Sequence, residues 1–147
     1  MSIKKSDSLG LSEAYGAFIN NEFCAIQGAT FPAVAAASGE RMADIAPCGT
    51  AEIGMPVTAA EKAFPAWKAL QPEERASYLL KLADAIEKDT PRLMMIDTLD
   101  IGRGLWETGI DHAIAVAQYR YFAAAAITHE GFGRPLPDGY LVAKRAP

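Results

Sequence analysis

The sequence predicts an α+β fold that is mainly helical, with β-hairpins near the N-terminus, about four helices in the middle and a strand at the C-terminus. Short apolar arms around Asn20-Asn21 indicate a hairpin, because asparagine tolerates the left-handed backbone of a tight turn. From residue 50 onward, apolar side chains recur every three or four positions, which is the helical period. The 147 residues, of which 50% are hydrophobic and 22% charged, have the composition of one globular domain.

Two hairpins account for the predicted β region. The arms of the first are residues 17–19 and 22–26, on either side of the asparagine pair. The second pairs residues 31–36 with 41–45 across Ser38-Gly39, although the alanines in its first arm are weak strand formers. Both hairpins precede the helical region, so strands and helices are segregated along the chain, as in α+β proteins.

The first helix is predicted to be interrupted near its start. Thr50 is suitable as an N-cap, and the helical period continues to Trp67. Gly54 and Pro56 lie within this stretch, and a proline inside a helix costs about 3 kcal/mol. We therefore expect the regular part of the helix to begin near Pro56, with the proline in its first turn.

Three more helices are predicted after the first. The second begins at Pro72 and carries an apolar stripe, and Thr90-Pro91 ends it and starts the third. Gly102 ends the third, because glycine is common just after a helix. The fourth begins near Thr108, whose spacing to Asp111 is a capping-box variant. Its predicted apolar face consists of Ile110, Ile114, Ala117 and Tyr121.

The C-terminal end is predicted to be a loop followed by a strand. Residues 131–139 contain several prolines and glycines and are expected to form the loop. Residues 140–145 have a β-like pattern. A terminal strand needs a neighbour to pair its backbone groups, and the sequence offers few other strands for this purpose.

Charge and hydropathy exclude several classes of function. The formal net charge is −4, whereas binding to nucleic acid or to an anionic membrane needs clustered lysine and arginine. The longest apolar run, residues 121–127, is too short to span a membrane. Residues 1–14 are polar and lack periodicity, so we predict a flexible tail and no secretory signal. The predicted location is the cytoplasm.

Glycine and cysteine patterns do not indicate a cofactor or a nucleophile. Gly102-Arg103-Gly104 lacks the third glycine of the dinucleotide fingerprint and follows a helical pattern rather than a strand. Gly131-Phe132-Gly133 has no helix after it, so both segments are interpreted as turns. Cys24 and Cys48 are more consistent with buried or loop thiols than with catalytic ones, because neither has a base nearby in the sequence.

Two other groups of polar residues leave alternatives open. Asp97 and Asp100 are three residues apart on one helical face, as paired acids are in some active sites, and a solvated helix face is the favoured alternative. His112 and His129 are far apart and lack ligand spacing to a cysteine. A helix-surface imidazole and a loop imidazole are the favoured interpretations for these two histidines.

Eight short segments, taken in order, resemble the NAD(P)-dependent aldehyde dehydrogenase family. Residues 98–103 resemble its Thr-Leu-Asp-x-Gly-Lys segment, and residues 140–147 resemble its strand ending in Arg-Glu-Pro. The resemblance covers nearly everything from residue 17 onward and assigns residues 15–147 to the N-terminal portion of an incomplete aldehyde-dehydrogenase-like domain. The segments are Phe18–Phe23, Ser38–Glu40, Ala63–Trp67, Pro72–Arg75, Leu79–Asp84, Thr98–Arg103 with Arg120–Ala123, and Tyr140–Pro147.

The resemblance also implies what these 147 residues lack. In the family, the dinucleotide-binding domain, the catalytic cysteine, the general-base glutamate and the oxyanion-site asparagine come later in the chain. No catalytic or cofactor-binding residue can therefore be named here, and neither Cys24 nor Cys48 takes the position of the nucleophile. We expect no cofactor to bind this segment alone, and NAD or NADP to serve the complete enzyme.

Two site assignments are implied by the resemblance. Asp100 corresponds to an aspartate that, in some relatives, holds a monovalent cation together with main-chain carbonyls near Val34. A carboxylate and carbonyls suit a hard cation, with further ligands from outside this segment. Ile114 falls on the helix that lines the aldehyde tunnel in relatives, with core packing as an equal alternative.

The leading hypothesis is an N-terminal segment of an enzyme that oxidises aldehydes to carboxylic acids, catalytically silent by itself. The alternative is a non-catalytic interaction subunit that docks on a full-length relative or on a separately encoded remainder. Both predict exposed apolar surface, because strands and helix faces would pack on parts of the fold outside these residues. The chain is also expected to be able to form a homo-oligomer. The third hypothesis is an independent helical ligand-binding domain without a dehydrogenase role.

Overall fold

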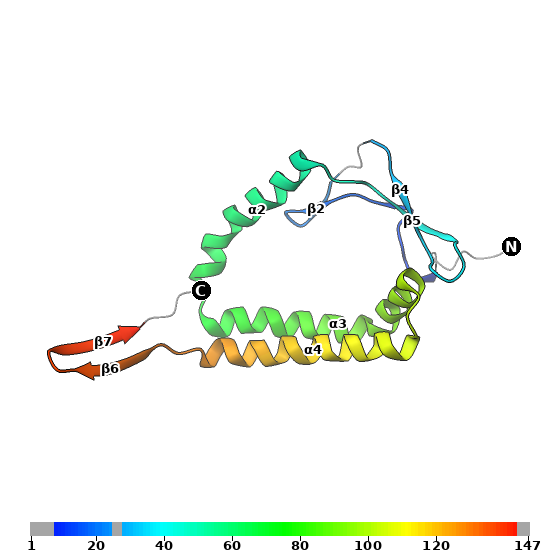
Figure 1. The fold of residues 1–147 in the computed structure, drawn as a ribbon. Helices are drawn as coiled ribbons and strands as arrows, with labels where there is room; N and C mark the ends of the chain where they lie inside the picture. Colours follow the sequence, from blue (N-terminus) through cyan, green and yellow to red (C-terminus); the bar gives the residue numbers. More distant parts are fainter. Residues whose placement is uncertain (1–7, 25–27, 144–147) are drawn as a thin grey trace.

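The computed structural model describes residues 8–24 and 28–143, which form an open arrangement of three helices, a small sheet and two hairpins (Figure 1). Helices α3 and α4 lie side by side, α2 leads from the sheet region to α3, and the C-terminal hairpin projects away from the helices. The helices are α2 (Thr50–Ala69), α3 (Pro72–Ile101) and α4 (Leu105–Thr128). The strands are β1 (Ala14–Tyr15), β2 (Phe18–Ile19), β3 (Glu22–Phe23), β4 (Phe31–Val34), β5 (Arg41–Ile45), β6 (Phe132–Leu136) and β7 (Gly139–Ala143).

Both predicted N-terminal hairpins are present, with shorter strands than expected, because β3 ends at Phe23 and β4 ends at Val34. β2 pairs with β3 in antiparallel register, and Asn20 and Asn21 adopt φ angles of 53° and 66° in the turn between them. Ala25 and Ile26, the end of the predicted second arm, lie outside the described residues. β4 pairs with β5 in antiparallel register, and Gly39 supplies the positive φ of the turn that joins them.

The sheet has a third strand that the sequence did not reveal. β1 pairs with β5 in parallel register, with Ala14 opposite Asp44, so the sheet order is β1-β5-β4. The predicted tail therefore reaches the sheet at Ala14, and the carbonyl of Leu9 accepts a hydrogen bond from Arg92 of α3 at 3.3 Å. A two-residue strand has too little periodicity to be recognised from sequence. The flexibility of residues 1–14 stays a prediction.

The predicted start of the first helix is wrong. α2 is continuous from Thr50, with Pro56 and Pro65 inside it, whereas we expected the regular part to begin near Pro56. The Glu52 carboxylate accepts a hydrogen bond from the Gly49 amide at 2.9 Å, which satisfies one of the free amides at the helix start. A proline removes only one backbone hydrogen bond, so a capped first turn can precede Pro56.

The predicted break at Thr90-Pro91 is also wrong, and the described residues contain three helices rather than four. α3 continues through Pro91 to Ile101, and its C-terminal part bends toward the sheet (Figure 1). Proline is a common cause of such bends. α3 packs on α4 on both sides of Pro91, which offsets the cost of the proline. The predicted ends of this helical region, Pro72 and Gly102, are confirmed, and Gly102 is left-handed with φ 74°.

The start of α4 differs from the prediction by one turn. α4 begins at Leu105 rather than near Thr108, and the carboxylate of Glu107 accepts a hydrogen bond from the Gly104 amide at 3.1 Å. Thr108 is instead a fully buried residue whose hydroxyl donates to the Leu105 carbonyl at 2.9 Å. The capping partner is thus Glu107 rather than the Thr108–Asp111 pair.

Small side chains line the seam between α3 and α4. Ala76 and Ala83 on α3 are buried, as are Val116 and Ala123 on α4. Each pair is spaced by seven residues, the spacing of positions that face an antiparallel neighbour. A Cβ added at Gly109 of α4 would lie 2.9 Å from the Met94 methyl group, so the helices also approach closely at this end of the seam.

The predicted C-terminal loop is partly wrong. Residues 132–136 form β6, which pairs with β7 in antiparallel register along its whole length. Pro135 lies opposite Tyr140, and within the described residues β6 and β7 form a separate two-stranded sheet, so β6 is an edge strand, where proline is tolerated. The predicted terminal strand is confirmed over β7, whereas its last two residues, 144 and 145, lie outside the described residues. The strand that pairs with it comes from the segment that we expected to be a loop. All side chains of this hairpin are exposed except the half-buried Ala143.

The fold leaves a large area of apolar surface uncovered, as we expected. The chain exposes 10947 Å² to solvent, whereas a compact protein of 15.7 kDa exposes roughly 7300 Å². Among the described residues, five of the six buried hydrophobic side chains are alanines. Many large apolar side chains are exposed, among them Phe18, Phe64, Trp106, Tyr121 and Tyr140.

Candidate functional site

The end of α3 meets the sheet at the positions that the resemblance assigns to a cation site. The carbonyl of Leu99 accepts a hydrogen bond from the Ala36 amide at 2.9 Å. A Cβ at Gly102 would lie 3.1 Å from the Cβ of Ala36, so this contact is close. Asp100 follows Leu99, and Val34 precedes Ala36 by two residues in the chain. The fold therefore brings the two predicted segments together.

Few side-chain and backbone oxygen atoms are available at this junction as ligands for a cation. The side chains of Asp100 and Val34 are both exposed. Within residues 8–24 and 28–143, no group of three or more His, Cys, Asp or Glu side chains is placed to hold a metal ion. One carboxylate and neighbouring carbonyls are fewer oxygens than a hard cation takes. A cation at this place would need further ligands from other parts of the family fold.

A polar joint between α3 and α4 lies next to this junction. Nδ1 of His112 donates to the Thr108 carbonyl oxygen at 2.7 Å, and Nε2 lies 3.5 Å from the Asp97 carboxylate. The hydroxyl groups of Thr98 and Thr108 are 3.2 Å apart. The His112 side chain is only 13% exposed, so it is not the surface imidazole that we expected. Asp97 pairs with this histidine, whereas the side chain of Asp100 is exposed.

The joint could not be found from spacing within one helix. Its members are on two helices, and their meeting depends on the turn at Gly102-Arg103-Gly104 and on the antiparallel packing of α3 and α4. The guanidinium of Arg103 in this turn pairs with Asp111 and lies 3.9 Å from Glu107. The contact could have been predicted by pairing the two helices on either side of Gly102 in antiparallel orientation, because this pairing places Thr98 near Thr108.

The apolar face predicted on α4 exists but does not face α3. The buried side of α4 consists of Thr108, Val116 and Ala123. Ile114, assigned to an aldehyde tunnel by resemblance, is 50% exposed, and Tyr121 on the same side is 68% exposed. The core-packing alternative for Ile114 is therefore not met within the described residues, and its side chain remains free to line a surface completed by other parts of the fold.

An ion cluster joins α3 and α4 away from the junction. The guanidinium of Arg120 hydrogen-bonds to Glu87 at 2.7 Å and to Asp84 at 2.9 Å. The hydrogen bond from Arg120, followed by its positive charge, lowers the pKa of Glu87 below the ordinary value of 4.5, and both carboxylates raise the pKa of Arg120. These groups are solvent-exposed, so the cluster orients the helices more than it stabilises them.

The Arg120 cluster predicts a pH dependence with a definite sign. Because the pKa of Glu87 is lowered on folding, its stabilising effect is complete above 4.5 and is lost as the pH falls through the lower folded value. In Glu87→Gln we expect a lower Tm than wild type at about pH 6, and a smaller Tm difference at about pH 3. Thermal melts at both pH values test this. Glu61→Gln, on the exposed surface of α2, is the control and should show no such convergence.

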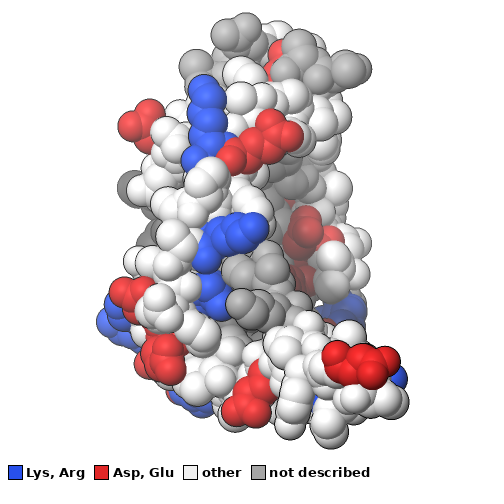
Figure 2. All heavy atoms as spheres, turned by 90° about the vertical axis from the view of Figure 1, so that its left-hand side faces the viewer, with Lys and Arg blue, Asp and Glu red and all other residues white. Residues whose placement is uncertain are grey.

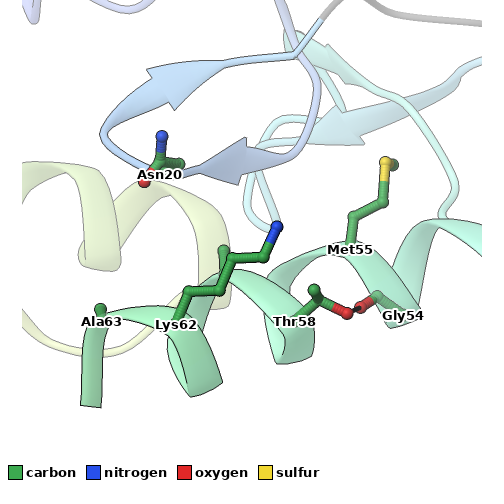
Figure 3. A pocket seen from close by; sticks show the side chains of 7 residues that line it. Asn20, Gly54, Met55, Thr58, Lys62 and Ala63 are labelled. Carbon is green, nitrogen blue, oxygen red and sulfur yellow. Dashed lines mark hydrogen bonds between the residues drawn. The ribbon is translucent and has the colours of Figure 1, made fainter. Parts of the chain in front are cut away.

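A shallow pocket lies between the turn of the first hairpin and α2 (Figure 3). Its volume is about 660 Å³. The Lys62 and Met55 side chains extend from α2 toward the hairpin that carries Asn20. The Thr58 hydroxyl is occupied, because it donates to the Gly54 carbonyl at 3.0 Å. The pocket thus has one amide and one ammonium group beside apolar side chains, and its lining contains no His, Cys, Asp or Glu.

The described residues contain no glycine-rich turn that runs from a strand into a helix, the feature that binds the phosphates of a dinucleotide. Gly102 ends one helix and Gly104 precedes the next, whereas a phosphate-binding turn runs from a strand into a helix. The parallel pairing of β1 and β5 covers two residue pairs and has no crossover helix. Cys24 is half-buried and Cys48 exposed, and neither sulfur has a hydrogen-bonded base within the described ranges. The expectation that this segment alone binds no cofactor remains a prediction.

The surface charges are mixed in sign. On the face shown in Figure 2, lysine and arginine side chains alternate with aspartate and glutamate, and broad uncharged areas separate them. This face has no basic patch of the kind that binds phosphate backbones. Among the described residues, no helix is both long enough and apolar enough to cross a membrane.

The comparisons with known proteins agree on one family. The model of the aldehyde dehydrogenase family matches residues 23–147. The chain is 36% identical over 125 residues to (Z)-2-((N-methylformamido)methylene)-5-hydroxybutyrolactone dehydrogenase of Acinetobacter baylyi, covering 82% of this chain and 25% of the relative. It is 32% identical to an aldehyde dehydrogenase of Paracoccus denitrificans, covering 85% of this chain and 25% of the relative.

Solved structures give the same result. A putative aldehyde dehydrogenase from Burkholderia cenocepacia superimposes with a TM-score of 0.83 and 32% identity, covering 90% of this chain and 28% of that chain. PnpE in complex with nicotinamide adenine dinucleotide superimposes with a TM-score of 0.78 and 34% identity, covering 83% of this chain and 26% of that one. The chain therefore spans about a quarter of the length of the relatives that it matches.

Proposed function

Because the chain belongs to the aldehyde dehydrogenase family, we propose that it is the N-terminal scaffold segment of an enzyme that oxidises an aldehyde to a carboxylic acid with NAD or NADP. The observation that carries this proposal is the coverage, since the chain matches only about a quarter of each relative's length. The apolar surface left uncovered supports it, because the remaining fold would bury this surface.

We propose three contributions of this segment to the complete enzyme. Asp100 and carbonyl groups near Val34 would supply part of a monovalent cation site, which is supported by the hydrogen bond between Leu99 and Ala36. Ile114 would line the path of the aldehyde, which is supported by its exposure on α4. The helices would form one wall of the fold. The location in the cytoplasm is part of the same proposal.

The 147-residue chain alone is expected to be catalytically silent. Thiohemiacetal formation and hydride transfer need a positioned thiolate, oxyanion donors and a bound nicotinamide. In the family these groups come from later residues, and Cys24 and Cys48 have no activating base among the described residues. The test is the absorbance of NADH or NADPH formed by the pure chain with a panel of aldehydes. Turnover above the rate of a heat-denatured sample would refute the proposal.

The alternative function is a non-catalytic subunit that docks on a full-length relative or on a separately supplied remainder. The uncovered apolar surface favours this alternative as strongly as the first, because either partner would cover it. A cooperative melt of the whole chain as a dilute monomer, in which α2 melts together with α3 and α4, would count against an obligatory partner of either kind. Circular dichroism follows the melt, and light scattering shows whether the chain is a monomer.

A further inference from the structure

α2 carries apolar side chains on the side opposite its contact with the hairpin. The pocket beside Asn20 is lined by one side of α2 (Figure 3). On the other side, five residues are spaced by four, three, four and three positions, which places them in one row along a helix. We call this row the α2 stripe, and it consists of Ile53, Val57, Ala60, Phe64 and Trp67. All five are exposed, Phe64 to 50%.

α2 has little to hold it as a helix within the described residues. None of its side chains between residues 52 and 69 is buried. It contains Gly54, Pro56 and Pro65, each unfavourable inside a helix. It contacts β2, and the Trp67 ring lies 5.8 Å from the Tyr78 ring of α3. Pro56 and Pro65 divide α2 into stretches shorter than about 12 residues, and helices that short are marginal in water without tertiary packing, so α2 needs a surface that covers it.

We propose that the α2 stripe is a docking surface for the part of the aldehyde dehydrogenase fold that lies outside these 147 residues, and that α2 becomes a stable helix only when this surface is covered. The proposal rests on the proposed function. α3 and α4 behave differently, because they bury Ala76, Ala83, Val116 and Ala123 against each other. α3 and α4 fold as a self-supporting pair, and α2 follows when it docks.

The exposed area favours the rest of the family fold over a second copy of the chain as the occupant. The chain exposes 10947 Å², about 3600 Å² more than a compact protein of its mass. A standard interface with a second copy covers about 800 Å² on each partner. The excess area of this chain is more than four times that value, so one interface of standard size would not cover it. The relatives are about four times as long as the matched segment, which supplies enough additional chain to cover this area.

Hydrogen exchange on two proteins tests the proposal. The first is the 147-residue chain, and the second joins it at Pro147 to the part of the Acinetobacter baylyi relative that follows the matched segment. In the chain alone, amides of α2 should exchange within about tenfold of unstructured rates, and those of α3 and α4 should be slower by a hundredfold or more. In the joined protein, α2 should be protected like α3. Equal protection of α2 and α3 in the chain alone would overturn the proposal.

A pair of variants in the joined protein isolates the stripe. Val57→Glu places a charge in the α2 stripe, and Lys62→Glu places the same residue on the opposite side of α2. Glutamate is a better helix former than valine, so a loss of protection in Val57→Glu cannot come from helix propensity. We expect α2 protection to fall at least about tenfold in Val57→Glu, because docking would bury the charge, and within about twofold in Lys62→Glu. Equal protection in both variants would exclude the stripe as the docking surface.

The outcomes separate this proposal from the proposed function. Aldehyde oxidation by the joined protein reports the proposed function, and exchange of α2 in the chain alone reports the docking proposal. If the joined protein is active and α2 is already protected in the chain alone, only the docking proposal fails. If α2 is protected only in the joined protein and no aldehyde is oxidised, only the proposed function fails.

Discussion

Replacing Pro56 by alanine is expected to stabilise α2 by up to about 3 kcal/mol, the difference between the two residues in a helix interior. Pro56 lies inside α2, where it cannot donate a hydrogen bond to the carbonyl of Glu52 and its ring crowds that carbonyl. Its side chain is exposed, so the substitution leaves no cavity. Far-ultraviolet circular dichroism of the 147-residue chain should therefore show a larger helical signal in Pro56→Ala than in wild type.

Pro72→Ala is the matched control for this prediction. Pro72 is the first residue of α3, where proline is favourable because the amide there has no partner within the helix. We expect the helical signal of Pro72→Ala to equal that of wild type. An equal rise in both variants, or no rise in Pro56→Ala, would show that the internal proline does not limit α2.

Replacing Ala83 by leucine is expected to destabilise the fold by about 1–3 kcal/mol. Ala83 is fully buried in the seam between α3 and α4, where the other buried side chains are also small. Extra methylene groups would force the helices apart and weaken the contacts of Arg120 and Thr108 across the seam. Thermal denaturation should show a Tm lower by roughly 3–10 °C.

Ala85→Leu is the control that separates the effect of crowding in the seam from the effect of an added leucine elsewhere on α3. Ala85 is two residues away on the exposed side of α3, and its replacement adds the same atoms outside the seam. Surface substitutions of this kind change stability by less than about 0.5 kcal/mol. If the Tm of Ala83→Leu equals that of Ala85→Leu, the seam between α3 and α4 is not the core of the chain.

The local pattern of the sequence was sufficient for turns and helix ends with a distinct chemical signature. Asn20-Asn21, Gly39, Pro72 and Gly102 were placed correctly because each satisfies a backbone requirement that few other residues meet. The helix boundaries predicted at Pro56 and Pro91 were wrong, because capping and packing can offset the cost of a proline and local sequence does not reveal either. β6 was missed because the segment contains proline and glycine and resembles a loop.

The candidate site was predictable only in part. The resemblance to the family implied that Asp100 and carbonyl groups near Val34 share a cation site, and the hydrogen bond between Leu99 and Ala36 brings their segments into contact. The pairing of His112 with Asp97 was not predictable from spacing, because it depends on how two helices align. The predicted apolar face of α4 had the correct helical period, but periodicity does not tell which face of a helix a neighbouring element covers.

The most direct measurement is aldehyde-dependent formation of NADH or NADPH by two samples at equal concentration. One is the 147-residue chain, and the other is the same chain joined to the remainder of the Acinetobacter baylyi relative. If these helices and strands are the scaffold of a longer catalyst, the joined protein turns over and the short chain does not. Turnover by the short chain alone, or a folded joined protein without activity, would contradict this account.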